Sequence, residues 1–523
     1  MRIETVVKDG LCTSCGICAG VCPKNCIKSE YHGGSYLPMI DESECVNCGL
    51  CHDVCPGKGA DYVKIYETIS ELIPDEIMVG NFKKCLVAQA KDEDVLHKST
   101  SGAVVTTLVS NLLHDGVYDS AFLLDTYDYS KQIFTQRYTK DMNLENTPKS
   151  RYLTVNHSQA VKYILKNKNE RIILVGTPCF LQGFLQIVNH FNLNRNNYLL
   201  LGIFCDKNFN YNMWNYFKSV FEINHNGTTN KLKHLYFRDK DKGSWPGNVI
   251  LENTKNKWLL PAKSRMLMKE YFCLERCLYC IDKLNQFADI SCGDNYTKGQ
   301  YKSSKLGSSN LIIRTELGDN IMKRYSDKFN IDDILINEIL TSQHVNVRKD
   351  NYVYSLYKSS EIGYTFNNLP PKAACTMCEE LGHKQKYKTL LQKLHMGQNE
   401  DFPALAADMC LRVVLPYKFI LNVTDELLDK KIVMYGAGGV GYDYYRQLYD
   451  YARCQVVAWV DSNYSKFKYK EGTVQPVEDI KSLDYDLILI AVRDKKVAEE
   501  IKNSLADNGV DREKLYWIAP VCL

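Results

Sequence analysis

The sequence predicts a multidomain α/β protein with a cysteine-rich N-terminal domain, a central α/β domain and a C-terminal domain built on a parallel sheet. Three observations support this prediction. Two cysteine runs lie before residue 60, helical and strand-like patterns alternate from about residue 80, and a glycine-rich turn follows an apolar strand near residue 430. With 523 residues, the chain is long enough for about three domains that each bury a core.

The composition is that of a globular protein, and its charge balance gives no sign of a nucleic-acid-binding surface. Apolar residues make up 45%, charged residues make up 24%, and the net charge is only +3. No apolar run approaches the roughly 20 residues of a membrane span, and the opening MRIETVVKDG lacks the apolar core of a signal peptide. We therefore expect a cytoplasmic protein with no membrane span and no nucleic-acid partner.

The two cysteine runs, CTSCGICAGVCP and CVNCGLCHDVCP, share the spacing Cys-x2-Cys-x2-Cys-x3-Cys-Pro. Most of the 21 cysteines have only two or three residues between them and another cysteine, which indicates metal ligation in a reducing compartment. This spacing is typical of bacterial two-cluster ferredoxins, in which the fourth cysteine of each run ligates the other cluster. The predicted ligands of the two [4Fe–4S] centres are Cys12, Cys15, Cys18 and Cys55 for one, and Cys45, Cys48, Cys51 and Cys22 for the other.

The other residues of these runs fit the same interpretation. Gly16 and Gly49 allow the backbone to approach inorganic sulfur closely, and Pro23 and Pro56 fix φ where the chain leaves the cluster. A four-cysteine zinc site is the alternative, but such a site does not need a doubled run. Cys26 lies outside both runs, and we expect a packed thiol there.

The central region alternates helices and strands. SGAVVTTLVSNLLHDG (101–116) has apolar residues at helical spacing, and RIILVGTPC (171–179) and YLLLGIFC (198–205) indicate buried strands. Each strand is followed by a cysteine, Cys179 or Cys205. Because ligands bind at the carboxyl edge of open α/β sheets, we expect these cysteines at a ligand-binding edge.

CLERCLYC (273–280) has the Cys-x3-Cys-x2-Cys spacing of radical-SAM enzymes. It follows MLMKEYF (266–272), which has a helical pattern, and no glycine-rich SAM segment comes after it. Since so short a motif arises by chance in a cysteine-rich chain, a radical-SAM enzyme remains only an alternative. The Cys277 and Cys280 pair leads into ADISCGD (288–294), which predicts a short strand and a turn.

From Met1 to about residue 345 the sequence resembles the coenzyme F420 hydrogenase/dehydrogenase beta-subunit family, which includes related flavin- and iron–sulfur-dependent reductases. The resemblance rests on both cysteine runs and on KSTSGAVVTTL, VGTPCFLQG, IFCD and CLYCIDKLNQFADISCGD. It implies an α/β domain that carries FAD and a further [4Fe–4S] cluster, between which electrons pass. The candidate ligands of this third cluster are Cys179, Cys205, Cys277 and Cys280.

Two features of this ligand set depart from the simplest pattern. Cys205 is followed by Asp206, where bacterial members of the family usually have histidine. Cys273 is left as a spare or alternative ligand.

The resemblance also implies flavin-binding residues. The segment STSG opens a helix, so the backbone N–H groups near Ser101 and Gly102 would meet a pyrophosphate, and Lys98 would add a point charge. The same residues also form an ordinary helix N-cap. Asp289 and Asp294 would bind ribose hydroxyls or simply cap the turn.

A new domain begins near residue 430 with KKIVMYGAGGVGYDYYRQL, which predicts a strand, a Gly-x-Gly-x-x-Gly turn and a helix. The glycines are Gly436, Gly438 and Gly441, and VVAWVDSN places Asp461 at the end of the next strand. This glycine–acid arrangement is the fingerprint of a Rossmann domain, and YDLILIAV (485–492) supplies a further strand. NAD, a nucleotide or a nucleotide-activated sugar is the expected ligand, although many small domains of this type have none.

The predicted domains are a two-cluster ferredoxin domain at 1–65, a FAD and iron–sulfur domain at 80–345, a poorly defined helical linker at 346–425, and a Rossmann-like module at 428–523. The lone pair CTMC (375–378) in the linker is expected to be structural.

The predicted function is that of an iron–sulfur flavoprotein oxidoreductase. Electrons would pass between ferredoxin-type clusters and FAD, and a hydride would be exchanged with a soluble acceptor or donor, either coenzyme F420 or a sugar-related substrate. The expected protein partner is ferredoxin or another redox protein. No side chain stands out as an acid or base. The alternative is an electron-transfer subunit of a larger complex, without a substrate of its own.

Overall fold

The structure is a computed structural model that describes residues 2–69, 72–125, 129–224, 231–240, 245–255, 257–297, 305–365, 367–378, 384–449 and 454–523. The chain divides into two compact units. The first comprises Met1–Met213, Arg238–Gly247 and Met268–Glu400, and the second comprises Trp214–Phe237, Asn248–Leu267 and Asp401–Leu523.

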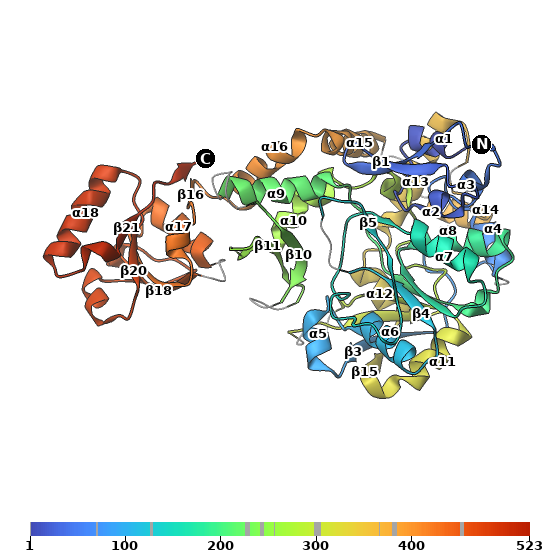
Figure 1. Ribbon diagram of the computed structural model, residues 1–523, viewed down its shortest axis with the longest axis horizontal. Helices are drawn as coiled ribbons and strands as arrows, with labels where there is room; N and C mark the ends of the chain where they lie inside the picture. Colours follow the sequence, from blue (N-terminus) through green and yellow to red (C-terminus); the bar gives the residue numbers. More distant parts are fainter. Residues whose placement is uncertain are drawn as a thin grey trace. The chain divides into compact units, whose positions relative to one another are not determined.

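The N-terminal part of the first unit is a small α/β fold in which each cysteine run leads into a short helix (Figure 1). The antiparallel strands of its hairpin pair from Ile27↔Ile40 to His32↔Ser35. Its elements are α1 (Ile3–Lys8), α2 (Ile17–Val21), β1 (Ile27–His32), β2 (Ser35–Ile40), α3 (Leu50–Asp53) and α4 (Tyr62–Thr68).

The core of the first unit is an eight-stranded mixed sheet with the order β15-β3-β14-β13-β9-β8-β4-β6. Strands β4, β8, β9 and β13 are parallel neighbours, and the remaining pairs are antiparallel. The strands are β3 (Lys84–Ala90), β4 (Ser120–Leu123), β6 (Gln136–Tyr138), β8 (Ile172–Gly176), β9 (Tyr198–Ile203), β13 (Ile290–Asp294), β14 (Ser309–Ile313) and β15 (Phe329–Asp333).

Helices cover both faces of this sheet because its strands are apolar on both sides. In β8, Ile172 and Leu174 enter one core and Ile173 enters the other. The first core includes residues of α7 (Ser158–Lys166) and α8 (Pro178–His190), and the second includes residues of α6 (Val104–His114) and α11 (Glu316–Arg324). Burial of each such isoleucine or leucine contributes roughly 1.5–3 kcal/mol.

The N-terminal fold shares the first of these cores, and glycines let it approach closely. A Cβ at Gly20 of α2 would lie 2.6 Å from Cβ of Val161 in α7. A Cβ at Gly183 of α8 would lie 2.5 Å from Cδ1 of Ile17 and 3.1 Å from Cδ of Pro56. Both cysteine runs are therefore held directly against the helices of the central sheet.

The region predicted as a linker contains helices that pack within the two units. In the first unit these are α13 (Val347–Ile362), α14 (Pro371–Met377) and α15 (Lys384–Gln398), which follow α12 (Ile336–Ser342). In the second unit α16 (Phe402–Met409) buries Phe402, Ala406 and Ala407.

The second unit contains an antiparallel hairpin, β11 (Asn248–Glu252) and β12 (Lys257–Leu260), and a five-stranded parallel sheet with the order β19-β18-β17-β20-β21. The direction of strand addition reverses at β17, which places α17 (Gly439–Tyr449) after the central strand. The sheet strands are β17 (Lys430–Tyr435), β18 (Cys454–Val460), β19 (Val474–Gln475), β20 (Leu487–Ile490) and β21 (Leu515–Trp517); α18 (Lys495–Asp507) follows β20.

The mixed α/β fold that the sequence predicts is thus confirmed. None of the helices in the described ranges combines the length and the apolar character needed to span a bilayer.

Candidate functional site

The two N-terminal cysteine runs fold into the same backbone turn. Gly16 and Gly49, with φ of 72° and 76°, precede α2 and α3, and the residues two positions earlier, Ser14 and Asn47, both have φ of 55°. A Cβ at Gly16 would also collide with the side chain of Asn156. Because glycine adopts left-handed backbone most easily, Gly16 and Gly49 allow each cysteine run to turn around its own thiols.

Four thiols from the two runs lie together in the interior. Burial raises the pKa of Cys18 well above its ordinary value, and the nearby thiols of Cys15, Cys55 and Cys12 raise it further. The backbone N–H of Ser14 donates a hydrogen bond to Sγ of Cys12 at 3.3 Å. This set includes the crossover of Cys55 from the second run. Such a group of thiolates needs a compensating positive charge, which iron would supply.

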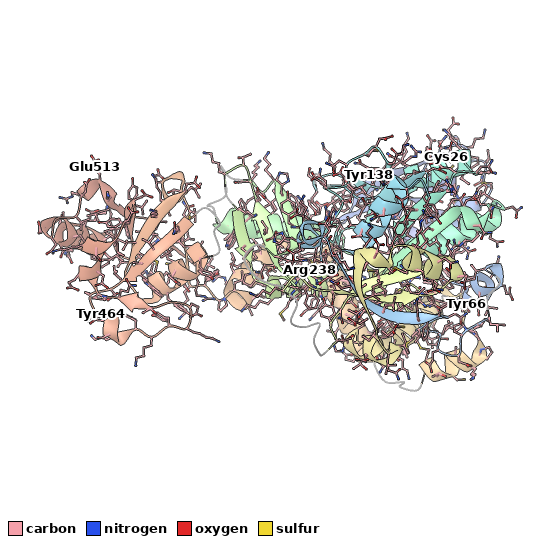
Figure 2. All side chains as sticks on the ribbon, turned by 90° about the horizontal axis from the view of Figure 1, so that it is seen from below. Cys26, Tyr66, Tyr138, Arg238, Tyr464 and Glu513 are labelled. Carbon is pink, nitrogen blue, oxygen red and sulfur yellow. The ribbon has the colours of Figure 1, made fainter. Side chains whose placement is uncertain are left out.

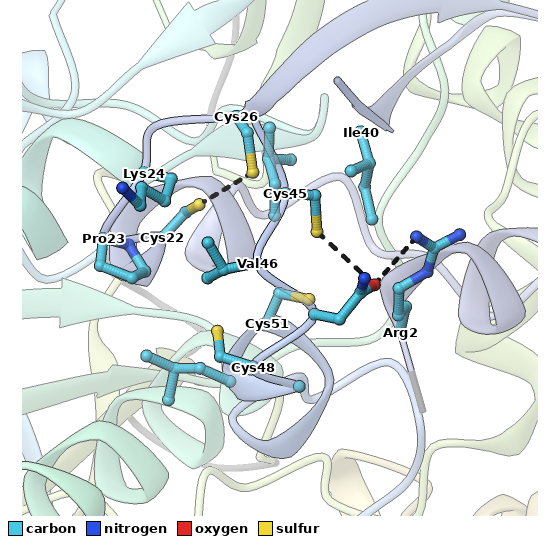
Figure 3. A pocket seen from close by; sticks show the side chains of 14 residues that line it. Arg2, Cys22, Pro23, Lys24, Cys26, Ile40, Cys45, Val46, Cys48 and Cys51 are labelled. Carbon is cyan, nitrogen blue, oxygen red and sulfur yellow. Dashed lines mark hydrogen bonds between the residues drawn. The ribbon is translucent and has the colours of Figure 1, made fainter. Parts of the chain in front are cut away.

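The other four cysteines of the runs line a pocket (Figure 3). These are Cys22, Cys45, Cys48 and Cys51. Cys48 is exposed, so this group lies at the surface. The pocket is also lined by Cys26, a buried residue whose Sγ lies 3.4 Å from Sγ of Cys22.

The third cysteine group is assembled from three separate segments. Cys179 lies in the first turn of α8, Cys205 follows β9, and Cys277 lies in a short 3-10 helix, η3 (Glu275–Tyr279), that precedes Cys280. Burial is the main cause of the raised pKa of Cys205, and Cys277, Cys179 and Cys280 are the thiols that raise it further. The backbone N–H of Asn208 donates to Sγ of Cys277 at 3.3 Å.

Cys273 contacts this group but occupies a different environment. It follows α10 (Arg265–Tyr271), is buried, and donates a hydrogen bond to the carbonyl oxygen of Leu274 at 3.3 Å. A hydrogen bond from Cys273 lowers the pKa of Cys277 to about 7. The structure therefore supports a hydrogen-bonding thiol beside Cys277, rather than the first member of a cysteine triad.

The three groups follow one another in space. Cys51 of the pocket is one of the thiols that raise the pKa of Cys18, and Cys15 is one of those that raise the pKa of Cys179. The backbone N–H of His157 donates to the carbonyl of Cys15 at 2.8 Å, and its ring stacks on Phe180 with centroids 3.6 Å apart. Helix α8, which carries Cys179, thus contacts through Phe180 the residue that binds the backbone of Cys15.

The donor sets fit clusters better than single ions. Each group consists of four thiols, which is the usual ligand set of a [4Fe–4S] cluster. Within the described ranges, no three histidine, cysteine, aspartate or glutamate side chains converge closely enough to hold one metal ion.

Some of the predicted flavin-site residues meet at one edge of the central sheet. Asp294 at the end of β13 pairs in register with Ser309 at the start of β14. The hydroxyl of Ser309 accepts a hydrogen bond from the backbone N–H of Gly102 at 3.0 Å and lies 2.9 Å from Oγ of Ser101. Helix α6 begins two residues after Gly102, following Ala103, which has a left-handed φ of 59°. The sequence thus brings three of its five candidates together.

The other two candidates lie elsewhere. Lys98 is about half exposed and pairs with Glu145, with 3.4 Å between Nζ and Oε1. The carboxylate of Asp289, which immediately precedes β13, accepts hydrogen bonds from the Arg195 guanidinium at 3.0 Å and the Thr315 hydroxyl at 2.8 Å. These internal partners give Asp289 a structural role at the opposite end of the strand from Asp294.

Two buried cations, which no sequence motif indicates, lie near Asp294. Arg238, marked in Figure 2, is 4% exposed, and its Nη1 pairs with Asp294 at 2.7 Å, while Nη2 has no hydrogen-bond partner among the described residues. Lys240 is equally buried and donates to the carbonyls of Leu96 and Leu306. Burial and the nearby Arg238 lower the pKa of Lys240 to about 8. Neither residue belongs to a recognisable motif, so only the fold shows their position.

The C-terminal glycine turn is held by hydrogen bonds from within its own domain. The backbone N–H of Ala437 donates to Oδ2 of Asp461 at 2.7 Å, and the Trp459 indole donates to the carbonyl of Gly436 at 2.8 Å. A Cβ at Gly441 would collide with that same carbonyl, whereas nothing lies within 4 Å of a Cβ at Gly438. The predicted acid therefore braces the turn, and space remains beside Gly438.

Comparison with protein families identifies four matched regions. Residues 11–59 match the 4Fe-4S dicluster domain, and residues 85–162 and 169–334 match the N-terminal and C-terminal models of the coenzyme F420 hydrogenase/dehydrogenase beta subunit. Residues 428–516 match the N-terminal domain described as C2185-like.

Two curated relatives are similar to parts of the chain. The coenzyme F420-dependent sulfite reductase of Methanocaldococcus jannaschii is 25% identical over 335 residues, which cover 61% of this chain and 47% of that protein. Coenzyme F420 hydrogenase subunit beta of Methanococcus voltae is 26% identical over 273 residues, which cover 49% of this chain and 87% of that subunit.

A solved structure of the F420-reducing [NiFe] hydrogenase complex from Methanosarcina barkeri contains a chain that aligns with a TM-score of 0.42 and 19% identity, over 57% of this chain and 99% of that one. The matched family models and the three cysteine groups indicate an electron-transferring iron–sulfur oxidoreductase. Between residues 85 and 334 the chain is therefore related to the coenzyme F420 hydrogenase/dehydrogenase beta subunit, with a 4Fe-4S dicluster domain in front.

Proposed function

We propose that the protein is an iron–sulfur flavoprotein that exchanges electrons with a redox protein at its surface and a hydride with a soluble substrate in its interior. When bound, three [4Fe–4S] clusters would supply one-electron transfer and FAD would supply the hydride exchange. Coenzyme F420 and a sugar-related compound are the two substrate classes in view, and the names of the relatives favour the former.

The observation that carries this proposal is the succession of three all-thiol groups. The ligands would be Cys22, Cys45, Cys48 and Cys51 at the surface, then Cys12, Cys15, Cys18 and Cys55, then Cys179, Cys205, Cys277 and Cys280. Consecutive groups are close enough for their thiols to interact: Cys51 raises the pKa of Cys18, and Cys15 raises the pKa of Cys179. A redox protein bound near the exposed Cys48 would therefore exchange electrons, through the three proposed clusters, with the carboxyl edge of the central sheet.

The edge formed by Ser101, Gly102 and Asp294 is the proposed flavin site. Two buried cations support a phosphate-bearing cofactor here: Arg238, whose Nη2 has no partner in the part of the chain that the structure describes, and Lys240 two residues later. Arginine and lysine bind phosphate through charge-assisted hydrogen bonds, and in a buried site these are strong. Asp294 fixes the guanidinium at 2.7 Å and would accept from a ribose hydroxyl with its remaining lone pairs.

Analysis of metal, sulfide and flavin after anaerobic purification of the full chain tests this proposal. We expect about twelve irons, about twelve sulfides and one FAD per chain, because three [4Fe–4S] clusters each hold four of both. About eight irons and no flavin would contradict the central claim. Reduced ferredoxin and reduced coenzyme F420 should each reduce the bound flavin when supplied separately.

A second candidate is an electron-transfer subunit without a substrate of its own. The observation in its favour is that a relative matched over 87% of its length is named as a subunit of a hydrogenase. Purified protein that exchanges electrons with ferredoxin but reduces coenzyme F420 only after another subunit is added would support this candidate.

We also propose that the C-terminal module is a Rossmann-like domain that binds NAD or a nucleotide-activated sugar. The parallel order β19-β18-β17-β20-β21 and the open space beside Gly438 support this assignment. A diphosphate would compete with Asp461 for the N–H of Ala437, so the ligand must replace a 2.7 Å hydrogen bond.

Two glycine variants of the full chain separate ligand binding from folding. Gly438→Ala should leave the thermal transition unchanged, because no described atom lies within 4 Å of the added Cβ, and should reduce the heat of nucleotide binding in isothermal titration. Gly441→Ala should instead lower stability by about 1–3 kcal/mol, because its methyl group meets the carbonyl of Gly436. If neither NADH nor a uridine-diphosphate sugar gives heat with the unmodified protein, the module has neither ligand.

A further inference from the structure

Helix α13 lies beyond the region matched to the beta-subunit family, which ends at residue 334. Its N-terminal turns nevertheless contact η3, the segment that contains Cys277. Arg348, Asn351 and Lys358 all direct polar side chains toward the third cysteine group and its flanking residues. None of these contacts is expected of a linker.

Arg348 binds the backbone next to two of the proposed ligands. Its guanidinium is 4% exposed, and Nη2 donates to the carbonyl of Cys205 at 2.9 Å and to that of Asp206 at 3.1 Å. Nη1 donates to the carbonyl of Cys280 at 3.2 Å. One planar fork therefore ties together two segments that are 75 residues apart in the sequence, in a geometry that lysine does not reproduce.

Asn351 holds the same loop from the next turn of the helix. Its side-chain amide donates to the carbonyl of Cys280 at 2.7 Å and to that of Cys277 at 3.4 Å. Residues three apart lie on one face of a helix, so Arg348 and Asn351 reach the loop together. The buried Asn367, after the helix, donates to the carbonyl of Tyr279 at 2.9 Å.

Charge at this position bears directly on a bound cluster. Reduction adds one negative charge to the cluster, and a buried cation stabilises that charge more than a solvated one does. Arg348 lies 3.5 Å from the half-exposed carboxylate of Asp206, which also pairs with Lys283 at 3.1 Å. The Arg348 side chain is more buried than those of Asp206 and Lys283. The buried Arg276 is a further cation near the group: burial raises the pKa of Cys280, and Arg348 and Arg276 both act to lower it.

We infer that α13 positions the third cluster through Arg348 and Asn351, and that the Arg348 charge raises the reduction potential of that cluster. This inference rests on the proposed third cluster. It assigns both residues as positioning residues, since they act through the backbone of Cys205, Cys277 and Cys280 and through space.

The test is an EPR-monitored redox titration of the full chain with reconstituted clusters, combined with the rate of iron loss to a chelator. The signal of the third cluster is identified by its absence from Cys179→Ala. For Arg348→Gln we expect a lower midpoint potential for this signal alone, and about 10- to 100-fold weaker retention of its iron. Arg348→Lys should recover the potential but not the retention, because it restores charge without the fork.

Asn351→Ala and Arg324→Gln complete the design. Asn351→Ala should weaken iron retention with little change in potential, and it keeps the test decisive if Arg348→Gln does not fold. Arg324→Gln, which removes a half-exposed arginine at the end of α11, should change neither quantity. Unchanged potential and retention in both Arg348 variants and in Asn351→Ala would overturn the inference. About eight irons in the unmodified protein would instead overturn the proposed third cluster.

Discussion

Replacement of Cys179 by alanine is expected to lower the iron content from about twelve to about eight atoms per chain. Cys179 is partly buried near Cys277 and Cys280, and its removal leaves three thiols, which cannot occupy all four corners of a cluster. The two clusters of the dicluster domain should remain, because their eight cysteines lie in a different segment. Iron analysis and EPR of the reduced protein measure this loss, and FAD reduction by ferredoxin should be lost with it.

Cys273→Ala is the matched control, because it removes a buried thiol four residues before Cys277. It deletes one hydrogen bond to Cys277 and should preserve about twelve irons. Cys205→Ala should behave like Cys179→Ala. Loss of the third cluster in Cys273→Ala, together with a harmless Cys205→Ala, would show that the proposed ligand set is wrong.

The sequence predicts the two N-terminal cysteine groups more fully than it predicts the third group. Each N-terminal run places three thiols and a left-handed glycine within seven residues, so local geometry brings the ligands together. The third group needs the fold, because α8, the end of β9 and η3 meet only after the sheet has formed. Spacing alone did not decide between this group and a triad within CLERCLYC, and only the family resemblance indicated Cys179 and Cys205 as ligands.

Residues that act from outside a motif could not be predicted. Arg238 follows no recognisable pattern, and its role depends on Asp294, 56 residues later in the sequence. Similarly, α13 has charged and tyrosine residues along most of its length, so its sequence gives no sign that Arg348 and Asn351 are buried. Asp289 shows the opposite case, since a carboxylate in a suggestive motif serves an internal ion pair with Arg195.

Gly183→Ala is expected to loosen the dicluster domain from the central domain without loss of iron. The added Cβ would lie 2.5 Å from Cδ1 of Ile17, which adjoins Cys18, and 3.1 Å from Cδ of Pro56, which adjoins Cys55. Overpacking of this kind costs about 1–3 kcal/mol, although alanine favours the helix by about 1 kcal/mol. Chemical denaturation should therefore show a net loss, and Gly183→Val should show a larger one.

Gly183→Ala should also slow electron transfer, because the contact of Gly183 with Ile17 and Pro56 lies between two of the cysteine groups. Ile17 and Pro56 flank thiols of the first group, and Gly183 lies one helical turn after Cys179 of the third. A displaced helix α2 would widen the separation between the two clusters proposed there, so stopped-flow reduction of FAD by ferredoxin should slow while iron stays near twelve. Gly438→Ala adds the same methyl group where nothing lies within 4 Å and should leave both quantities unchanged. Wild-type stability and wild-type transfer in Gly183→Ala would mean that the two domains do not depend on this contact.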